Sequence, residues 1–237
     1  MNMPDDQKSK GVKTSSPPVR RFKALRFQIS IGILILAFTV LTALVVAFPS
    51  FAVDLKITIA LQSIHSSVFA WLMTVISWAG FWPQSLIITI VLIGAVLLLG
   101  HRWESVVLVM TAATEELFNI LIKLFIQRPR PGIDLIHVTN VLKSTSFPSG
   151  HVMFYMAFFG FLCFLIFTLL KPFWLRTILL IIFGSHILLI GLSRIYLGEH
   201  WASDVLGAYL IGSVCLIVFI RIYRWGKTRY FVKQPTA

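Results

Sequence analysis

Long apolar segments recur along this 237-residue sequence and restrict its fold more than any other feature. A run of about 20 apolar residues can cross the hydrocarbon core of a bilayer, ~30 Å thick, as a helix that satisfies its own backbone hydrogen bonds. Because 57% of the residues are hydrophobic, we expect a membrane to be the main solvent. The pattern predicts an all-α, polytopic membrane helical bundle. Its six transmembrane helices are expected near residues 28–48, 85–99, 106–127, 151–170, 178–192 and 201–220.

The two ends of the chain are polar and basic. We expect residues 1–27 to form a disordered cytoplasmic arm, residues 28–222 the transmembrane domain and residues 223–237 a basic cytoplasmic tail. The first apolar segment is longer than the roughly 7 to 15 residues of a signal-peptide core, so we interpret it as a retained anchor. The formal net charge of +12 indicates membrane topology and contact with anionic headgroups, because no nucleic-acid-binding motif accompanies it.

Residues 49–81 mix polar and apolar side chains, which predicts an interfacial amphipathic helix on the far side of the membrane. Six crossings put both termini in the cytoplasm and agree with the positive-inside rule at every basic cluster but one. The exception is a far-side loop that carries Arg128, Arg130 and Lys143, where prolines prevent a helix. A basic loop on the wrong side of a membrane requires a functional reason.

A second polar cluster occupies residues 193–204, between two apolar segments. If the chain is helical from about His200, Asp204 lies four residues on along the same face and can hold one imidazole nitrogen of His200. The other nitrogen is then free to act as a nucleophile or a base. Arg194 offers a planar set of donors suited to phosphate or carboxylate. These three residues alone fit many hydrolases, or a buried polar cluster.

The expected topology brings two further motifs to the same side. Lys123 ends an apolar segment and is either a salt-bridged scaffold residue or a substrate contact; the neighbouring Arg130 favours the second interpretation. Ser149 and Gly150 open the next helix, where free N–H groups and the helix dipole favour an anion. Gly150 has no Cβ, so its backbone can approach an oxygen closely. With Arg194, these groups predict a phosphate-binding site.

Two histidines can divide the work of phosphoryl transfer at such a site. His200, with its carboxylate partner Asp204, is the expected nucleophile, and His151, without one nearby in sequence, is the expected general acid. Three fixed cations and helix-end N–H groups can stabilise the transition state, so we predict neither a metal nor another cofactor. Both cysteines fall inside apolar segments, which is not the pattern of a metal cluster.

The three motifs together resemble the signature of the type 2 phosphatidic acid phosphatase (PAP2) superfamily, which vanadium haloperoxidases share. They are KLFIQRPRP at 123–131, PSGH at 148–151 and SRIYLGEHWASD at 193–204. The resemblance covers roughly residues 106–220 and implies a PAP2/haloperoxidase-like helical core. It also implies that the first His is the acid, the second His the nucleophile and the Asp its partner. The residues concerned are catalytic His151, His200 and Asp204, and phosphate-binding Lys123, Arg130, Ser149, Gly150 and Arg194.

The predicted function is therefore that of an integral membrane lipid phosphatase acting on the extracytoplasmic face through a phosphohistidine. Its partners would be the bilayer and a lipid phosphate, such as phosphatidate, phosphatidylglycerophosphate, an isoprenoid diphosphate or lipid A. We expect a bacterial cytoplasmic (inner) membrane, with the active site facing the outside or the periplasm and both termini in the cytoplasm. One alternative is a lipid phosphotransferase that uses the same phosphohistidine. The intramembrane charges Glu115, Glu116 and Lys123 suggest a transporter as another, but the complete catalytic set favours an enzyme.

Overall fold

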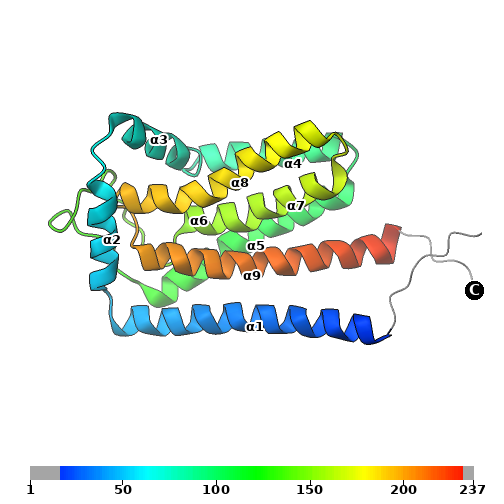
Figure 1. Ribbon diagram of the computed structural model, residues 1–237, viewed down its shortest axis with the longest axis horizontal. Coiled ribbons are helices and arrows are strands. Elements are labelled where there is room, and N and C mark those ends of the chain that lie inside the picture. Colours follow the sequence, from blue (N-terminus) through cyan, green and yellow to red (C-terminus); the bar gives the residue numbers. More distant parts are fainter. Residues whose placement is uncertain (1–16, 232–237) are drawn as a thin grey trace, which may run out of the picture.

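The computed structural model describes residues 17–231, which are helical throughout apart from the connections (Figure 1). The described part contains no strand, and the predicted all-α membrane bundle is confirmed. In chain order the helices are α1 (Pro17–Ala47), α2 (Ala52–Gln62), α3 (Ser67–Trp78), α4 (Gln84–Leu98), α5 (Arg102–Ile126), α6 (Gly150–Phe154), the π-helix η1 (Tyr155–Phe159), α7 (Gly160–Leu169), α8 (Phe173–Tyr196), α9 (Ala202–Gly226) and the π-helix η2 (Lys227–Phe231).

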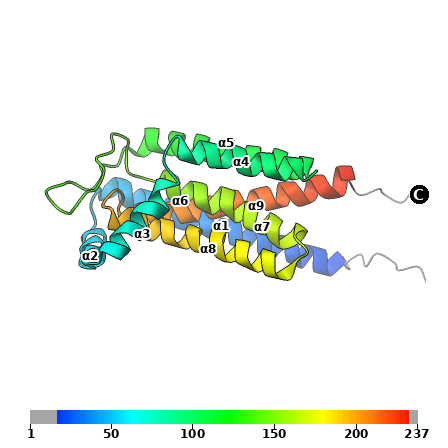
Figure 2. The same cartoon turned by 90° about the horizontal axis from the view of Figure 1, so that it is seen from above.

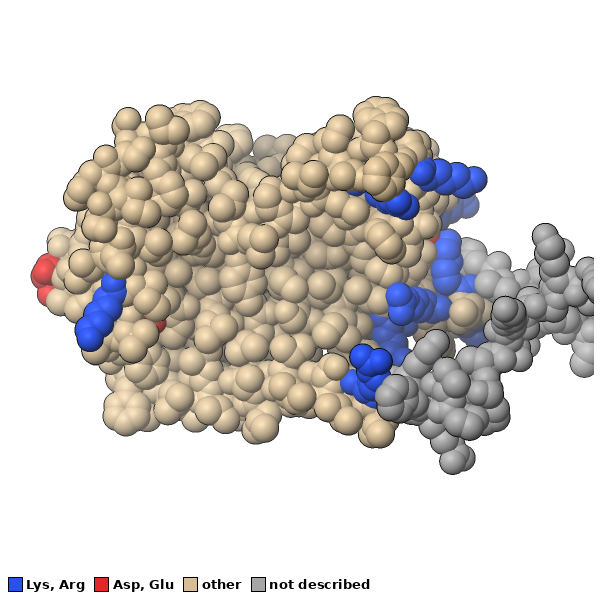
Figure 3. Space-filling model, viewed as in Figure 1, with Lys and Arg blue, Asp and Glu red and all other residues tan. Residues whose placement is uncertain are grey.

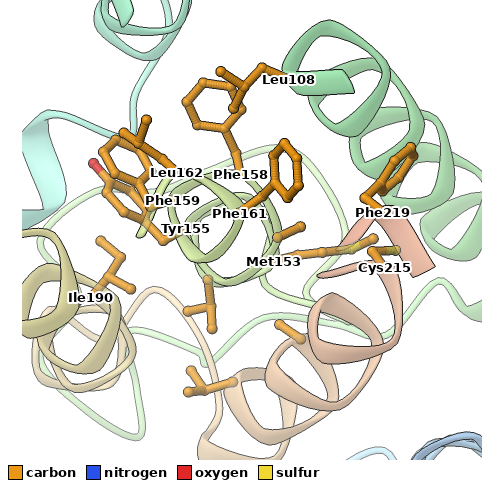
Figure 4. Close-up of a cluster of buried hydrophobic side chains, with 14 of the residues drawn as sticks. Leu108, Met153, Tyr155, Phe158, Phe159, Phe161, Leu162, Ile190, Cys215 and Phe219 are labelled. Atoms are coloured by element: carbon orange, nitrogen blue, oxygen red, sulfur yellow. The ribbon is translucent and has the colours of Figure 1, made fainter. Parts of the chain in front are cut away.

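The central element is the continuous rod made by α6, η1 and α7, which packs against α5, α8 and α9. Helix α1 lies along α9, α4 lies along α5, and α2 crosses one end of the bundle (Figures 1 and 2). Aromatic side chains of the central rod fill the interior, as Figure 4 shows. The buried cluster includes Leu108, Met153, Tyr155, Phe158, Phe159, Phe161, Leu162, Ile190, Cys215 and Phe219.

Five helices of the described part are long and apolar enough to cross a membrane, at residues 25–47, 102–126, 150–169, 173–196 and 202–230. The sixth expected crossing corresponds to α4, which has 15 residues. At 1.5 Å per residue such a helix is about 22 Å long, shorter than a hydrocarbon core of ~30 Å. The count of six crossings therefore stays a prediction.

Helix direction brings the three motifs to one end of the bundle. Helices α5 and α8 end there and α6 and α9 begin there, with the connection 127–149 covering them (Figure 1). At the opposite end, Lys and Arg side chains gather around the start of α1, the α7–α8 connection and the end of α9, whereas the visible middle of the molecule carries hardly any charge (Figure 3). The two ends of the bundle thus differ in chemistry.

The segments outside the core differ from expectation. Helix α1 already begins at Pro17, so residues 17–27 are helical; proline fits a first helical turn, where its missing N–H has no helical partner to lose. The expected tail is also helical as far as Phe231, while residues 1–16 and 232–237 lie outside the described part. Residues 49–81 form two helices, α2 and α3, instead of one, because Ser66 starts a new helix by accepting the N–H of Phe69.

Close packing of α9 on the central rod yields a stability prediction. A Cβ added to Gly212 would lie 2.9 Å from Cβ of Met156 and 3.2 Å from the carbonyl oxygen of Met153, whereas nothing lies within 4 Å at Gly184. Small residues let membrane helices approach this closely. We expect Gly212→Leu to lower the thermal unfolding temperature in detergent, and Gly184→Leu, which raises helix propensity equally, to leave it unchanged or higher. Equal melting of the two variants would contradict this packing.

Candidate active site

The residues singled out from the sequence meet at one end of the bundle. A cavity of about 690 Å³ reaches Lys123 near the end of α5, Arg130 in the connection after it, and Arg194 in the last turn of α8. Gly150 and His151 at the start of α6, and His200 before α9, also line the cavity. Ser149 and Asp204 are fully buried beside these residues. The structure thus brings all three motifs to one place.

His200 sits in the turn between α8 and α9, after Gly198 with a φ of 69°. Its Nε2 lies 3.1 Å from Nη1 of Arg130, and its Nδ1 lies 3.5 Å from Oδ2 of Asp204. Burial first, and then the nearby cations of the site, lower the pKa of His200 well below its usual value. The ring is therefore neutral near pH 7, and its lone pair lies on Nε2, which accepts from Nη1 of Arg130.

Asp204 lies next to one imidazole nitrogen of His200, as expected, but the two residues do not form a pair within one helix. Helix α9 begins at Ala202, so His200 precedes the helix, and the Asp204 carboxylate accepts the N–H of Trp201 at 2.9 Å as a helix cap. The hydroxyl of Ser146 donates to the same carboxylate and lies 3.4 Å from Nδ1 of His200. Ser146 is thus a neighbour of both residues that sequence reasoning missed.

Two cations of the site are held by neutral oxygens. The Arg130 guanidinium donates to the carbonyl of Ser144 at 2.7 Å and to that of Glu199 at 2.5 Å. Lys123 donates to the carbonyl of Thr145 at 2.5 Å, and no ion pair of Lys123 occurs among the described residues. Carbonyl oxygens orient these two groups and leave their positive charge uncompensated, which favours an anion in the cavity.

Arg194 is held differently. Its guanidinium forms an ion pair with the carboxylate of Glu199, donates to the hydroxyl of Ser77 at 2.5 Å and lies over the ring of Phe81, 5.0 Å from the centroid. Asn140 donates to the other oxygen of Glu199 at 2.7 Å. The motifs assigned no role to Glu199, and the structure shows that it orients Arg194.

Several buried polar atoms at or beside the cavity have no hydrogen-bond partner among the described residues. Among them are Oγ of Ser149, Nε2 of His151 and Nε of Arg194. The His151 ring packs edge-on against Phe81, with centroids 4.7 Å apart, so its position is set by packing. Buried polar groups are rarely left unpaired, and an oxyanion with several oxygens could pair with donors from all three residues.

Gly150 has a packing role that the sequence did not reveal. A Cβ there would lie 2.5 Å from Nδ2 of Asn119 on α5, so glycine lets α6 approach α5 closely. The expectation that Gly150 also admits a substrate oxygen stays a prediction. Asn119 lines the same cavity and is 7% exposed.

The largest correction concerns Arg128, which was expected in an exterior loop and is 2% exposed. Its guanidinium lies between two carboxylates, 2.9 Å from Asp54 of α2 and 2.5 Å from Asp204 of α9. It also donates to the hydroxyl of Ser203 at 2.7 Å, and both the N–H and the hydroxyl of Ser203 donate to Asp54. Asp54, expected on an interfacial helix, is buried because it neutralises this arginine.

Comparison with known proteins agrees with this geometry. A family model described as the PAP2 superfamily matches residues 104–227, more than half of the chain. The chain belongs to the PAP2 superfamily. Phosphatidylglycerophosphatase B of Bacillus subtilis (strain 168) is 34% identical over 127 residues, which are 52% of this chain and 60% of that protein. The matched part thus spans less than two thirds of that PAP2 relative's length.

Solved structures show the same PAP2 fold. The crystal structure of the first transmembrane PAP2 type phosphatidylglycerolphosphate phosphatase from Bacillus subtilis has a TM-score of 0.72 and 28% sequence identity, covering 85% of this chain and 98% of that chain. LpxE of Aquifex aeolicus has a TM-score of 0.57 at 23% identity, covering 73% of this chain and 98% of that chain, which is a likeness of fold alone.

The buried charge network of this PAP2 chain generates a second stability prediction. Arg128→Met would leave the carboxylates of Asp54 and Asp204 buried without their cation. Breaking a buried ion pair by removing one partner costs about 3 to 5 kcal/mol, so the free energy of unfolding should fall by about that amount. Denaturant unfolding in detergent micelles measures the change. Lys143→Gln, an exposed cation of the same connection, is the matched control and should change little. If Arg128→Met had the same free energy of unfolding as the wild type, the ion pairs of Arg128 would not stabilise the protein.

Proposed function

We propose that this chain hydrolyses a phosphomonoester or diphosphate of a membrane lipid through a phosphohistidine on His200. The observation that carries the proposal is the meeting, in one cavity at the end of a membrane bundle, of a buried neutral His200, two carbonyl-held cations and His151. Membership of the PAP2 superfamily supports it. The name of the Bacillus subtilis relative makes phosphatidylglycerophosphate one candidate substrate.

In the proposed reaction, the lone pair on Nε2 of His200 attacks phosphorus and the bond from phosphorus to the lipid oxygen breaks. His151, which takes up a proton once the negative charge of the phosphate occupies the cavity, donates that proton to the leaving oxygen, so the lipid departs as an alcohol. His151, now neutral, removes a proton from water as the water oxygen attacks the phosphohistidine. Inorganic phosphate leaves, both histidines return to their starting states, and the sum is hydrolysis of one P–O bond.

The remaining site residues have electrostatic roles in this proposal. Lys123, Arg130 and Arg194 would hold the phosphoryl oxygens, together with the Ser149 hydroxyl and the N–H of Gly150. Groups already oriented by carbonyls or by Glu199 need no reorganisation as charge develops in the transition state. Asp204 would stabilise the positive charge that His200 gains on attack, at the Nδ1 side of the ring.

We further propose that the site faces the outside or the periplasm, in a bacterial cytoplasmic membrane. The Lys and Arg residues at the far end of the bundle support this orientation, because cytoplasmic ends of membrane proteins are enriched in basic residues (Figure 3). A lipid phosphate at headgroup level would then enter the cavity from the outer leaflet, and both termini would lie in the cytoplasm.

Loss of the nucleophile is the direct test of the mechanism. With purified protein and phosphatidylglycerophosphate or an isoprenoid diphosphate in mixed micelles containing EDTA, we expect release of inorganic phosphate without an added acceptor. His200→Ala should abolish turnover, and Arg194→Ala should lower kcat/KM by on the order of 10² to 10³, the range for losing one preorganised donor.

Three results of the same assay would contradict the proposed mechanism. Near-normal turnover by His200→Ala would remove the proposed nucleophile, and a strict requirement for Mg²⁺ would contradict the metal-free reaction. Phosphate release only after addition of a lipid alcohol would identify a phosphotransferase.

Orientation can be tested with a membrane-impermeant thiol reagent on intact cells, in a background with both native cysteines replaced by alanine. Ile133→Cys, at a residue 75% exposed in the connection beside the site, should react from outside. Tyr230→Cys, at a residue 65% exposed at the opposite end, should react only after lysis. The reverse pattern would place the site in the cytoplasm.

A further inference from the structure

A polar stripe on α5 continues from the phosphate-binding end of the cavity toward the middle of the bundle. Asn119 lies one helical turn before Lys123, and Glu115 lies one turn before Asn119, so the three share one face. Glu116 borders the same face, and all four residues line the cavity. From Lys123 to Glu115 the stripe extends about 12 Å along the helix axis, at 1.5 Å per residue.

Two side chains of this stripe hold acceptor atoms that the protein does not satisfy. Glu115 is 3% exposed and Asn119 is 7% exposed, and neither Oε2 of Glu115 nor Oδ1 of Asn119 has a hydrogen-bond partner among the described residues. A carboxyl group inside a membrane helix is costly, and such groups commonly mark a binding site. The reaction proposed above uses neither residue.

The chemistry of the stripe restricts what could pair with it. Unsatisfied acceptors require a ligand that donates hydrogen bonds, which means a hydroxyl or an ammonium group. An ammonium in the same cavity would be repelled by the uncompensated charges of Lys123 and Arg130, whereas a hydroxyl carries no charge. The position also matters: Asn119 packs against Gly150, so its amide lies beside the place proposed for the phosphate.

We propose that Asn119 and Glu115 form a subsite for a hydroxyl group on the alcohol esterified to the phosphate, so that the chain prefers phosphomonoesters of a polyol such as glycerol. Glu116, at the exposed edge of the stripe, offers a further acceptor to the same alcohol. The inference rests on the proposed lipid phosphatase activity and names the substrate class within it. The cavity has the volume of a small-molecule site, about 690 Å³, which leaves room for more than a phosphate group.

The test compares two substrates that differ by one hydroxyl. These are phosphatidylglycerophosphate and its analogue in which the free hydroxyl of the headgroup glycerol is replaced by hydrogen. We expect wild-type kcat/KM to be roughly 10- to 100-fold higher for the hydroxyl-bearing lipid, the range for leaving one buried polar group without its hydrogen-bond partner. Glu115→Met should reduce this ratio to near one, with kcat/KM for the analogue changed little.

Matched variants separate recognition from folding. Glu115→Met replaces an unpaired buried polar group by an apolar one of similar size, so stability should stay equal or rise. Glu115→Gln keeps an acceptor oxygen and should keep a ratio closer to that of the wild type. Thr111→Val removes a polar atom one turn away on α5, outside the cavity, and should leave the ratio unchanged. Asn119→Leu tests the second acceptor, with the same expected loss of preference.

The outcomes distinguish this inference from the proposed function. Equal kcat/KM of the wild type for both lipids would overturn the hydroxyl subsite and leave the phosphatase activity standing. A wild-type preference that survives in both Glu115→Met and Asn119→Leu would overturn the assignment to this stripe. No phosphate release from any lipid phosphate would overturn the proposed function itself.

Discussion

The buried guanidinium of Arg128 is the interaction on which the site end of the bundle depends. It joins α2 through Asp54 and α9 through Asp204, and it also donates to the carbonyl of Pro49 at 2.9 Å. A charge in apolar surroundings costs several kcal/mol unless it is paired, so these segments must stay together. The carbonyl of Arg128 accepts the N–H of Ser146 at 2.8 Å, which fixes the polar connection over the site. The position of Asp204 next to His200 is a consequence of this anchoring.

The net charge of the cavity depends on whether neutral carbonyl oxygens or a carboxylate hold its cations. Backbone carbonyls orient Lys123 and Arg130 without neutralising them, whereas Glu199 neutralises Arg194. The cavity therefore keeps a positive potential that favours an anion, and this potential adds to burial, the larger cause, in lowering the pKa of His200. A single arrangement thus attracts an anion and keeps the facing imidazole neutral. The carboxyl groups and amide on α5 line a deeper part of the same cavity, where a neutral hydroxyl fits better than a second positive charge.

Local sequence signals predicted most of the helices and most of the residues that meet at the cavity. Helix boundaries such as the start of α6 at Gly150 agree with the PSGH motif, because a helix start is encoded by neighbours in the chain. The errors concern partners that are distant in sequence. Arg128 and Asp54 are 74 residues apart, and nothing in either segment indicates the other. An amphipathic segment with one aspartate has the same pattern whether that aspartate faces solvent or a buried arginine.

The sequence by itself determined the apolar segments and the spacing of the three motifs, because helix formation in a membrane and the order of polar residues are local properties. It also determined that the motifs share one end, since the direction of successive helices alternates. Only the tertiary structure decided that Arg128 is buried between Asp54 and Asp204, that Glu199 orients Arg194, and that Asn119 and Glu115 open onto the cavity. These pairings depend on which faces of distant helices meet, and that is set by packing of the whole bundle.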